Sequence, residues 1–471
     1  MDTMNQMDME DVTDQIERPS PFTPDETCEL VETAAWLLET QITDNPMLYI
    51  QPTFPAMVVS DVLAILQSQL YEVVAYEDLT PELLEIIDMA LKLVYDCVAP
   101  PRQQERTSFT RAPAPAPATQ QQQQQQQQPV AVAVAVMQSH IAALQAIPQP
   151  DQRTDAWYEF RYRYLTASSI WKAFFSESSR NQLIVDKCKP LDVGKYTSGG
   201  QSIESPMHWG HKYEPVSIQL YEERFQTHVS DFGCLPHPFI AYLAASPDGI
   251  NTAPTSPLYG RMLEVKNIFN REIDGIPKLE YWIQMQLQLE VCGLQECDFL
   301  ETRFKEYNDL DEFLADAADG AYDRTSTGAQ KGLMVLFMQA GSQPLYVYAP
   351  FEVMRQQETA AAWEDAIMLE HQALTWVKNI YWRLDQLSCV LVQRNQLWFQ
   401  AAMPVLDDLW QTIQHDKVHG YAHRLPNKRT GTSSTSSSST LSVDTSTGDG
   451  DEEGSSVSPA DKRYCMINIS L

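Results

Sequence analysis

The sequence predicts a mixed α/β fold for the central part of the chain, preceded by a small acidic module that is entirely helical. In the central part, stretches with helical apolar spacing alternate with short runs in which apolar and polar residues alternate one by one. In the N-terminal hundred residues, apolar side chains recur only at helical spacing. The 471 residues, 44% hydrophobic and 20% charged, suffice for two or three folded units.

Composition divides the chain into five segments. Residues 1–26 are acidic and polar, and we expect a disordered leader. Residues 27–99 predict the acidic helical module, and residues 100–134 a linker of Ala-Pro repeats and nine consecutive glutamines. Residues 426–471, rich in Ser and Thr, predict a disordered tail. The remaining stretch, 135–425, has the length and patterning of an enzyme domain.

The net charge of −30 argues against a histone-like protein that binds nucleic acid through a basic surface. Residues 1–99 hold 20 acidic and two basic side chains, so the helical module is either a solvated bundle or an acidic docking domain or DNA mimic. No secretory signal or membrane-spanning run is visible, and the eight cysteines show no pairing rhythm. We therefore expect a soluble intracellular protein with reduced thiols and no membrane partner.

Within the central stretch, the pattern alternates between helices and strands. Helices are expected at Gln138–Ala146, Asp155–Tyr164, Tyr213–Phe225 and Tyr281–Cys292, and a long helical region at Met354–Leu387. Strands are expected around Val229–Leu235 and at Arg261–Ile268, and a hairpin from Gly332–Met338 and Leu345–Ala349. The run Ala241–Ala245 leads into a turn at Ser246–Gly249.

Two acidic residues and a lysine form the main candidate for chemistry. Asp248 lies in the turn sequence Ser-Pro-Asp-Gly, and Glu264 and Lys266 follow on an alternating strand, where side chains two apart share a face. Two carboxylates can supply part of the oxygen coordination of Mg²⁺. A lysine beside them could orient a water molecule for hydrolysis of a phosphodiester. In isolation such a Glu-x-Lys is usually a solvated ion pair, so the surrounding motifs decide between the two interpretations.

Five motifs in order resemble the lambda exonuclease and YqaJ-type viral recombinase family, a group of restriction-endonuclease-like nucleases with the PD-(D/E)xK signature. They are Arg161 with the run 166–168, the run Trp209 to Glu214, the turn Ser246 to Gly249, the strand Glu264 to Lys266, and the run Tyr281 to Gln286. The resemblance covers about 150 residues, from Asp155 to roughly Tyr307. It implies a restriction-endonuclease-like core, in which helices flank a mixed central sheet.

The resemblance also implies roles for the residues of the metal site. Asp248, Glu264 and Glu214 would be the metal-binding carboxylates, Lys266 the catalytic lysine, and Gln286 the glutamine that completes the site. The implied metal is Mg²⁺, with Mn²⁺ as a substitute. The family often has Cys-Pro after the lysine, whereas this chain has Asn-Ile, which changes a loop but no metal ligand.

Three further residues, Arg161, Ser168 and Ser246, fall where the resembling family binds a terminal 5′-phosphate. An arginine guanidinium and serine hydroxyls can donate hydrogen bonds to a terminal phosphate. Such contacts bind the end of a nucleic acid without contacting its bases. Arg161 could also be a surface helix charge, and Ser168 a helix cap. The glutamines at 284, 286 and 288 cannot all face the site, and the choice of Gln286 rests on the resemblance alone.

Together with these residues, the resemblance implies a Mg²⁺-dependent 5′-to-3′ exonuclease on the ends of linear double-stranded DNA, in viral-type recombination, replication or repair. The resemblance further implies a homo-oligomer and a single-strand annealing protein as partner, in the nucleus or cytoplasm of an infected host cell. One alternative is an RNase or a structure-specific endonuclease on the same fold. Another is a non-catalytic interaction protein that uses the acidic module for docking.

Overall fold

The computed structural model describes residues 21–70, 79–105, 134–192, 206–317, 321–338 and 344–425. Most of the expected leader and linker, and the whole expected tail, lie outside the described residues. The chain forms two compact units, Met1–Pro101 and Arg102–Leu471. Among the described helices, none combines the length and the apolar character that crossing a bilayer requires.

In the described part of the first unit, helices account for every element. Helix α1 (Pro24–Asp44) begins at Thr23, whose hydroxyl accepts from the Glu26 amide while the Glu26 carboxylate accepts from the Thr23 amide. The others are α2 (Pro46–Tyr49), α3 (Phe54–Leu70) and α4 (Thr80–Cys97). Their apolar faces form a core that includes Leu38 of α1 and Ile87 of α4, both fully buried.

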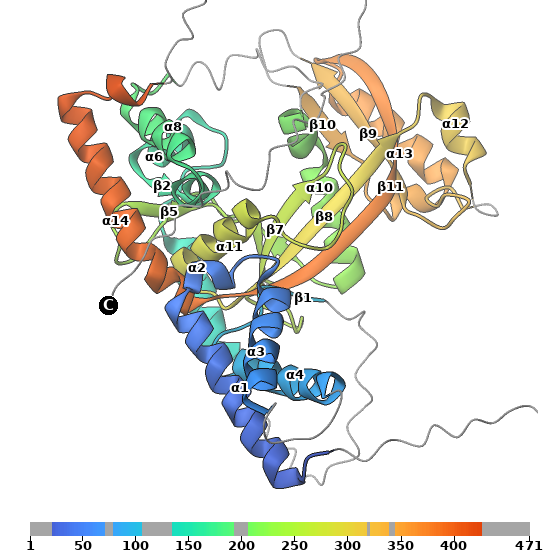
Figure 1. Ribbon diagram of the computed structural model, residues 1–471. Helices are drawn as coiled ribbons and strands as arrows, with labels where there is room; N and C mark the ends of the chain where they lie inside the picture. The colour runs from blue at the N-terminus through green and yellow to red at the C-terminus, as the bar shows by residue number, and fades with distance from the viewer. Residues whose placement is uncertain are drawn as a thin grey trace, which may run out of the picture. The chain divides into compact units, whose positions relative to one another are not determined.

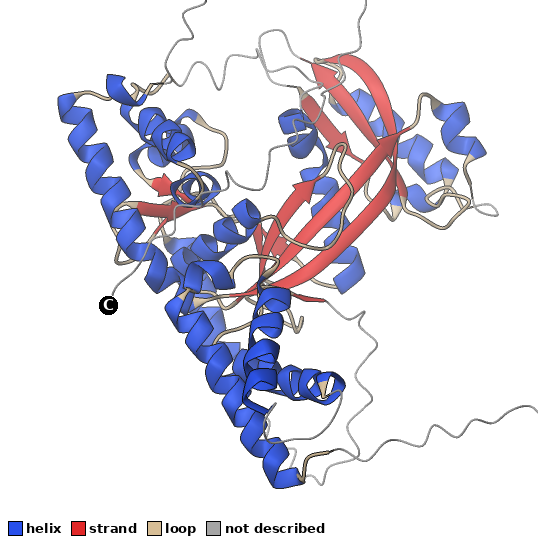
Figure 2. Ribbon diagram, in the orientation of Figure 1, coloured by secondary structure: helices blue, strands red, loops and turns tan. Residues whose placement is uncertain are grey.

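The second unit is built on a curled mixed sheet with the strand order β10-β9-β11-β8-β7-β6-β3, and β1 pairs with β11. Strands β7 and β8 run parallel, and the other neighbours are antiparallel (Figure 2). The bounds are β1 (Gln104–Glu105), β3 (Val229–Ser230), β6 (Gly249–Asn251), β7 (Met262–Asn267), β8 (Glu296–Glu306), β9 (Lys331–Met338), β10 (Leu345–Tyr348) and β11 (Thr375–Gln393). The expected mixed sheet and the expected β9–β10 hairpin are confirmed.

A second, smaller sheet has the order β2-β5-β4 and precedes the turn that carries Asp248. It consists of β2 (Leu165–Thr166), β4 (Leu235–Pro236) and β5 (Leu243–Ala245). Several helices lie in this half of the unit (Figure 1). They are residues 134–146, α6 (Asp155–Arg163), α7 (Ala167–Ile170), α8 (Glu177–Cys188), α11 (Leu279–Cys292) and α14 (Gln396–His419).

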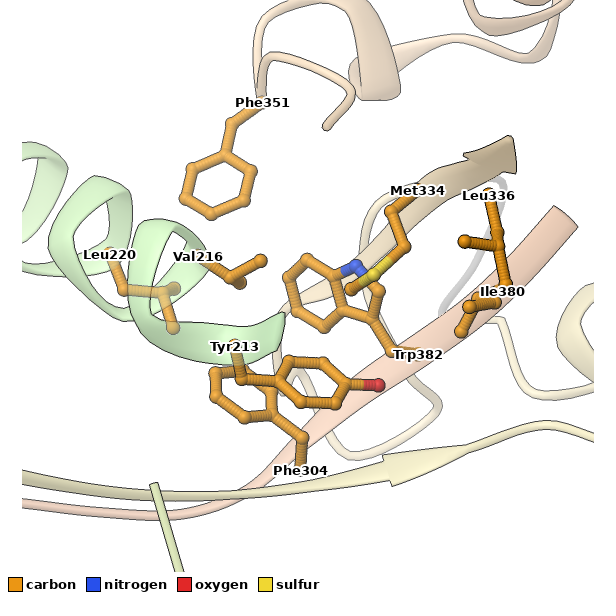
Figure 3. Packing of buried hydrophobic residues seen from close by; sticks show 9 residues of the cluster. All are labelled: Tyr213, Val216, Leu220, Phe304, Met334, Leu336, Phe351, Ile380 and Trp382. Atoms are coloured by element: carbon orange, nitrogen blue, oxygen red, sulfur yellow. The ribbon is translucent and has the colours of Figure 1, made fainter. Parts of the chain in front are cut away.

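Helix α10 (Pro206–Phe225) packs on the main sheet through a large apolar cluster (Figure 3). Tyr213 stacks on Phe304 of β8 with 4.5 Å between ring centroids, and Trp382 of β11 meets the edge of Phe304 at 5.3 Å. The cluster consists of Tyr213, Val216, Leu220, Phe304, Met334, Leu336, Phe351, Ile380 and Trp382. On the other side of β9, α12 (Leu310–Ala315) and α13 (Gln357–Glu370) cover a second cluster that includes Phe313 and Tyr381. Both faces of this part of the sheet are therefore buried.

The expected helical region Met354–Leu387 is wrong in its second half. Helix α13 ends at Glu370, and residues from Thr375 onward form β11, a strand of 19 residues. Two irregularities, between Trp376 and Lys378 and between Leu384 and Gln386, shift the pairing of β11. Each extra residue interrupts the two-residue alternation, so the sequence does not display a strand pattern over its whole length.

Candidate active site

The register between β6 and β7 brings the two predicted carboxylates together. Gly249 pairs with Leu263, so Asp248, one residue earlier in the turn, comes opposite Glu264. Asp248 Oδ2 accepts a hydrogen bond from the backbone amide of Val265 at 2.8 Å. The turn aspartate and the strand glutamate are thus fixed by the backbone of a single strand pair.

Glu264 is fully buried and its carboxylate is surrounded by donors. Lys266, two residues along the same strand face, forms an ion pair with Glu264 Oε1. From α11, Gln284 Nε2 donates to Oε1 at 2.6 Å and Gln288 Nε2 donates to Oε2 at 2.7 Å. The Lys266 ammonium also lies 5.1 Å from the ring centroid of Tyr281, at the start of α11. Since both carboxylate oxygens have partners, the buried charge is compensated.

The structure does not bring Gln286 to the carboxylates, contrary to the expected role. Its side chain accepts from the Asn395 amide at 2.6 Å and donates to the Gln393 carbonyl at 2.9 Å. Each helical residue turns by about 100°, so position 286 lies about 200° from Gln284, whereas Gln288 lies within about 40° of it. Gln284 and Gln288 therefore face Glu264, and Gln286 ties α11 to the last residue of β11 and to the N-cap residue of α14.

Glu214 of α10 completes the group of acidic residues and is paired with an arginine outside every predicted motif. Glu214 Oε2 accepts from Arg153 Nη2 at 2.6 Å. Arg153, in the turn before α6, has a backbone φ of 67°, in the left-handed region that few residues other than glycine adopt. Three residues after Glu214, Ser217 donates to Asn267 Oδ1 at 2.6 Å and so ties α10 to the end of β7.

The acidic residues perturb one another electrostatically. Burial, with the nearby charge of Glu264, raises the pKa of Asp248 to about 7. Burial, with the nearby charge of Asp248, raises the pKa of Glu214 to about 7, although Arg153 acts in the opposite direction. Burial alone would lower the pKa of Lys266, but the charges of Glu264 and Asp248 outweigh it and raise that pKa. The mutual effects place Glu214, Asp248, Glu264 and Lys266 in one cluster.

The three residues predicted to bind a phosphate end are also near this cluster. Arg161 of α6 donates from Nη2 to Ser168 Oγ at 2.7 Å and stacks over Trp157 at 4.1 Å. Ser246, which follows β5, has a buried hydroxyl without a nitrogen or oxygen partner among the described residues. Arg161 lies close enough to Asp248 for that carboxylate to influence its pKa, which burial lowers overall.

The donor set suits a hard divalent cation in its chemistry. Mg²⁺ commonly takes one or two carboxylates and completes its coordination with waters and substrate phosphates. Asp248 and Glu264 are such a pair, and Glu214 is a third carboxylate in the cluster. In the described residues, however, no three His, Cys, Asp or Glu side chains converge as a ready metal site. Lys266 and Arg153 instead hold Glu264 and Glu214.

Sequence reasoning missed Arg153, Gln284 and Gln288 as parts of the site. For the two glutamines a signal was present, because residues four apart share a helix face and Gln286 lies between them. For Arg153 there was none, since 61 residues separate it from Glu214 and only the tertiary fold joins them.

Comparison with known proteins gives three similarities. The chain is 29% identical over 315 residues to the uncharacterized protein R354 of Acanthamoeba polyphaga mimivirus, which covers 60% of this chain and 56% of that protein. The chain thus spans about half the length of this curated relative. Among solved structures, it is similar to the alkaline exonuclease LHK-Exo of Laribacter hongkongensis, at 19% identity and a TM-score of 0.30 over 56% of this chain and 97% of that one. LHK-Exo in complex with dAMP gives 16% identity and a TM-score of 0.32, over 56% of this chain and 95% of that one.

A family model described as the YqaJ-like viral recombinase domain matches residues 156–295. This range begins just before Arg161 and ends just after α11. It includes the turn of Asp248, the strand of Glu264 and Lys266, and Glu214. Residues 156–295 are therefore similar to the YqaJ-like viral recombinase domain, and the carboxylate cluster lies within this matched range.

Proposed function

We propose that the chain is a metal-dependent deoxyribonuclease, a 5′-to-3′ exonuclease on linear double-stranded DNA in viral-type recombination, replication or repair. The observation that carries the proposal is the buried group of Asp248, Glu264 and Lys266 within the range similar to the YqaJ-like recombinase domain. Buried ionisable groups with shifted pKa values are typical of catalytic sites. In a purely structural role, burying such groups would lower the stability of the fold. An annealing partner and a homo-oligomer remain predictions from the resemblance.

Asp248, Glu264 and Glu214 would hold the cation, preferably Mg²⁺. A divalent cation there would polarise the scissile phosphate and assist deprotonation of the attacking water. Gln284 and Gln288 would hold Glu264 in one orientation through their hydrogen bonds to its two oxygens.

Lys266 is the cation that the chain itself supplies at the scissile position. Its ammonium is held between Glu264 and the face of Tyr281, and the two nearby carboxylates keep it protonated at neutral pH. A protonated amine there would orient the attacking water and offset negative charge as it develops on the phosphate. Arg161, Ser168 and Ser246 would hold the terminal 5′-phosphate and so set the position of the first phosphodiester.

The test is digestion of 5′-phosphorylated linear duplex DNA by the full-length protein in Mg²⁺. Lys266→Ala should abolish the loss of linear DNA, and so should chelation, with Mn²⁺ restoring it. Lys305→Ala is a matched control, because Lys305 is a half-exposed lysine on the neighbouring strand β8 that pairs only with Asp385 in the described structure. Digestion that persists in Lys266→Ala would contradict the proposal.

Substrates of other kinds distinguish the alternatives. Closed circular duplex DNA and single-stranded RNA run beside the linear DNA under the same conditions. Cleavage of circles would indicate an endonuclease, and preferential cleavage of RNA a ribonuclease. A folded protein without activity on any substrate would support the interaction-protein alternative.

A further inference from the structure

The first two turns of helix α11 bear directly on the candidate active site. Gln284 donates to Glu264 at 2.6 Å, and Tyr281 lies beside the Lys266 ammonium. In the described structure, however, the N-cap residue Lys278 makes no side-chain hydrogen bond to the first turn. A helix start without such a cap is fixed by other contacts or frays. The position of Gln284 therefore depends on contacts from elsewhere in the chain.

Those contacts come from the first two residues of the second unit. Arg102 donates from Nη2 to the carbonyl of Pro277, just before the helix. The carbonyl of Arg102 in turn accepts a hydrogen bond from Trp282 Nε1, in the first turn, at 2.9 Å. Gln103 Nε2 donates to the carbonyl of Gly275 at 3.3 Å. These two residues therefore hold both the end of the loop that follows β7 and the start of α11.

The two residues are themselves firmly anchored. The next two residues of the chain form β1, which pairs antiparallel with β11. Arg102 is 9% exposed, and its Nη1 donates to Gln103 Oε1 at 2.9 Å. On the side of the helix, Trp282 is buried and packs edge-on against Trp398 of α14, with 5.2 Å between ring centroids. Because hydrogen bonds from a charged donor are about twice as strong as neutral ones, the guanidinium is the strongest of these links.

The first half of the loop between β7 and α11 is held by other residues. Arg271 forms an ion pair with Glu301 of β8, and the carbonyl of Arg271 accepts from Arg303 Nη1 at 3.2 Å. Ahead of it, the Asn267 amide donates to the Gly210 carbonyl of α10 at 2.8 Å. Loss of Arg102 would therefore loosen only the half of the loop that adjoins α11, and leave the end of β7 in place.

We propose that Arg102 is a positioning residue for the metal site, which acts through the start of α11 on Gln284 and thereby on Glu264. The inference rests on the proposed function, and adds to it a residue outside the range 156–295 that matches the family model. By holding the carbonyl of Pro277 and the indole of Trp282, Arg102 fixes the first turn of α11. Gln284 then keeps Glu264 in one orientation toward the cation.

The test measures Mn²⁺ binding to the full-length protein without DNA, by electron paramagnetic resonance. Asp248→Asn, which removes a carboxylate of the cluster, gives the background from the other acidic residues. In Arg102→Met the Kd for Mn²⁺ should rise about tenfold, at the lower end of the effect of residues that orient a metal ligand. The Mg²⁺ concentration that half-saturates digestion of linear duplex DNA should rise by the same factor. A folded Arg102→Met with wild-type values for both would overturn the proposal.

Arg394→Met is the matched control for stability. Arg394 is also a largely buried arginine that ties α11, but it does so through Glu290, near the other end of the helix, at 2.6 Å. Both substitutions should lower the melting temperature, because each leaves a buried polar partner unpaired. Only Arg102→Met should weaken Mn²⁺ binding. An equal loss of affinity in the two variants would show that Arg102 merely supports the fold, and the positioning role would be refuted.

A double variant tests whether Arg102 acts through Gln284. Gln284→Met removes the donor to Glu264 Oε1 and should weaken Mn²⁺ binding by itself. In Gln284→Met combined with Arg102→Met, the affinity should equal that of Gln284→Met alone, because the side chain that Arg102 positions is already absent. If the two losses multiplied in full, Arg102 would act by another route and the proposal would be wrong.

Metal binding and digestion together distinguish this inference from the proposed function. Mn²⁺ affinity that depends on Arg102, in a protein that digests no DNA, would support the positioning role and contradict the proposed function alone. Digestion that depends on Mg²⁺ but is insensitive to Arg102→Met would contradict the positioning role alone. A wild type whose Mn²⁺ binding equals that of Asp248→Asn would contradict both.

Discussion

Substitution of single glutamines on α11 tests which of them supports the site. The resemblance assigns this role to Gln286, whereas in the structure Gln284 and Gln288 contact Glu264. Gln286 is 1% exposed and bonds to the backbone amide of Asn395 and the carbonyl of Gln393. In Gln286→Met, of similar length, both groups lose their partner. At about 1–3 kcal/mol for each buried group, the free energy of unfolding should fall by about 2–6 kcal/mol.

Gln288→Met should act differently, because Gln288 donates to Glu264 at 2.7 Å and to the Ser246 carbonyl at 3.0 Å. Loss of a residue that orients a metal-binding carboxylate typically reduces metal affinity or activity by about 10–100-fold. The assays are urea unfolding and digestion of linear duplex DNA against Mg²⁺ concentration, at a temperature where both variants are folded. The reasoning would be refuted if Gln286→Met lost activity per folded molecule while its stability stayed unchanged.

Three more predictions concern stability, each measured by urea or thermal unfolding. Lys266→Met should lower the free energy of unfolding by about 3–5 kcal/mol, because the buried Glu264 loses its counterion. The double variant Glu264→Gln with Lys266→Met should recover part of this loss. If the effects of the two single substitutions on the free energy of unfolding simply added up in the double variant, that result would contradict a buried ion pair. Lys187→Met should have a higher free energy of unfolding than the wild type at pH 7. The difference should shrink as pH rises toward 10, because burial lowers the pKa of the folded Lys187 to about 7 and the wild type is stabilised where only the unfolded chain still binds the proton. A difference that stays constant with pH would contradict the lowered pKa. Gly332→Ala should cost about 1–3 kcal/mol, since its Cβ would lie 2.2 Å from Trp382 Cζ2, and an unchanged melting temperature would show that Trp382 moves freely.

The sequence allowed the core of the site to be predicted because its geometry is local. Glu264 and Lys266 share a face through strand periodicity, and Asp248 comes opposite Glu264 because a strand pair with a connecting loop joins them. Gln284 and Gln288 follow from helix periodicity, but three alternating glutamines left the orientation of α11 open. That orientation depends on how α11 packs against α7 and β5, which is tertiary information.

The parts that could not be predicted depend on long-range packing or on irregular backbone. Arg153 reaches Glu214 from a turn with positive φ, and no neighbouring motif signals it. Lys187 was indistinguishable from any other lysine on a charged helix until the structure showed it to be buried beside Arg161. Strand β11 was misread because its two bulges interrupt the alternation that marks a strand.

The length and position of β11 have a consequence for biosynthesis. Its 19 residues extend over roughly 60 Å and pair with β1, β8 and β9. Ribosomes add about 5–20 residues per second, so roughly 6–25 s pass between the emergence of Lys266 and that of Gln393. During this interval the β8 edge that β11 will cover has no partner from β11, and exposed strand edges promote aggregation. The strands that flank Asp248 and carry Glu264 are therefore made well before the strand that completes their sheet, and nascent chains that stall in this interval should depend on chaperones to remain competent for folding.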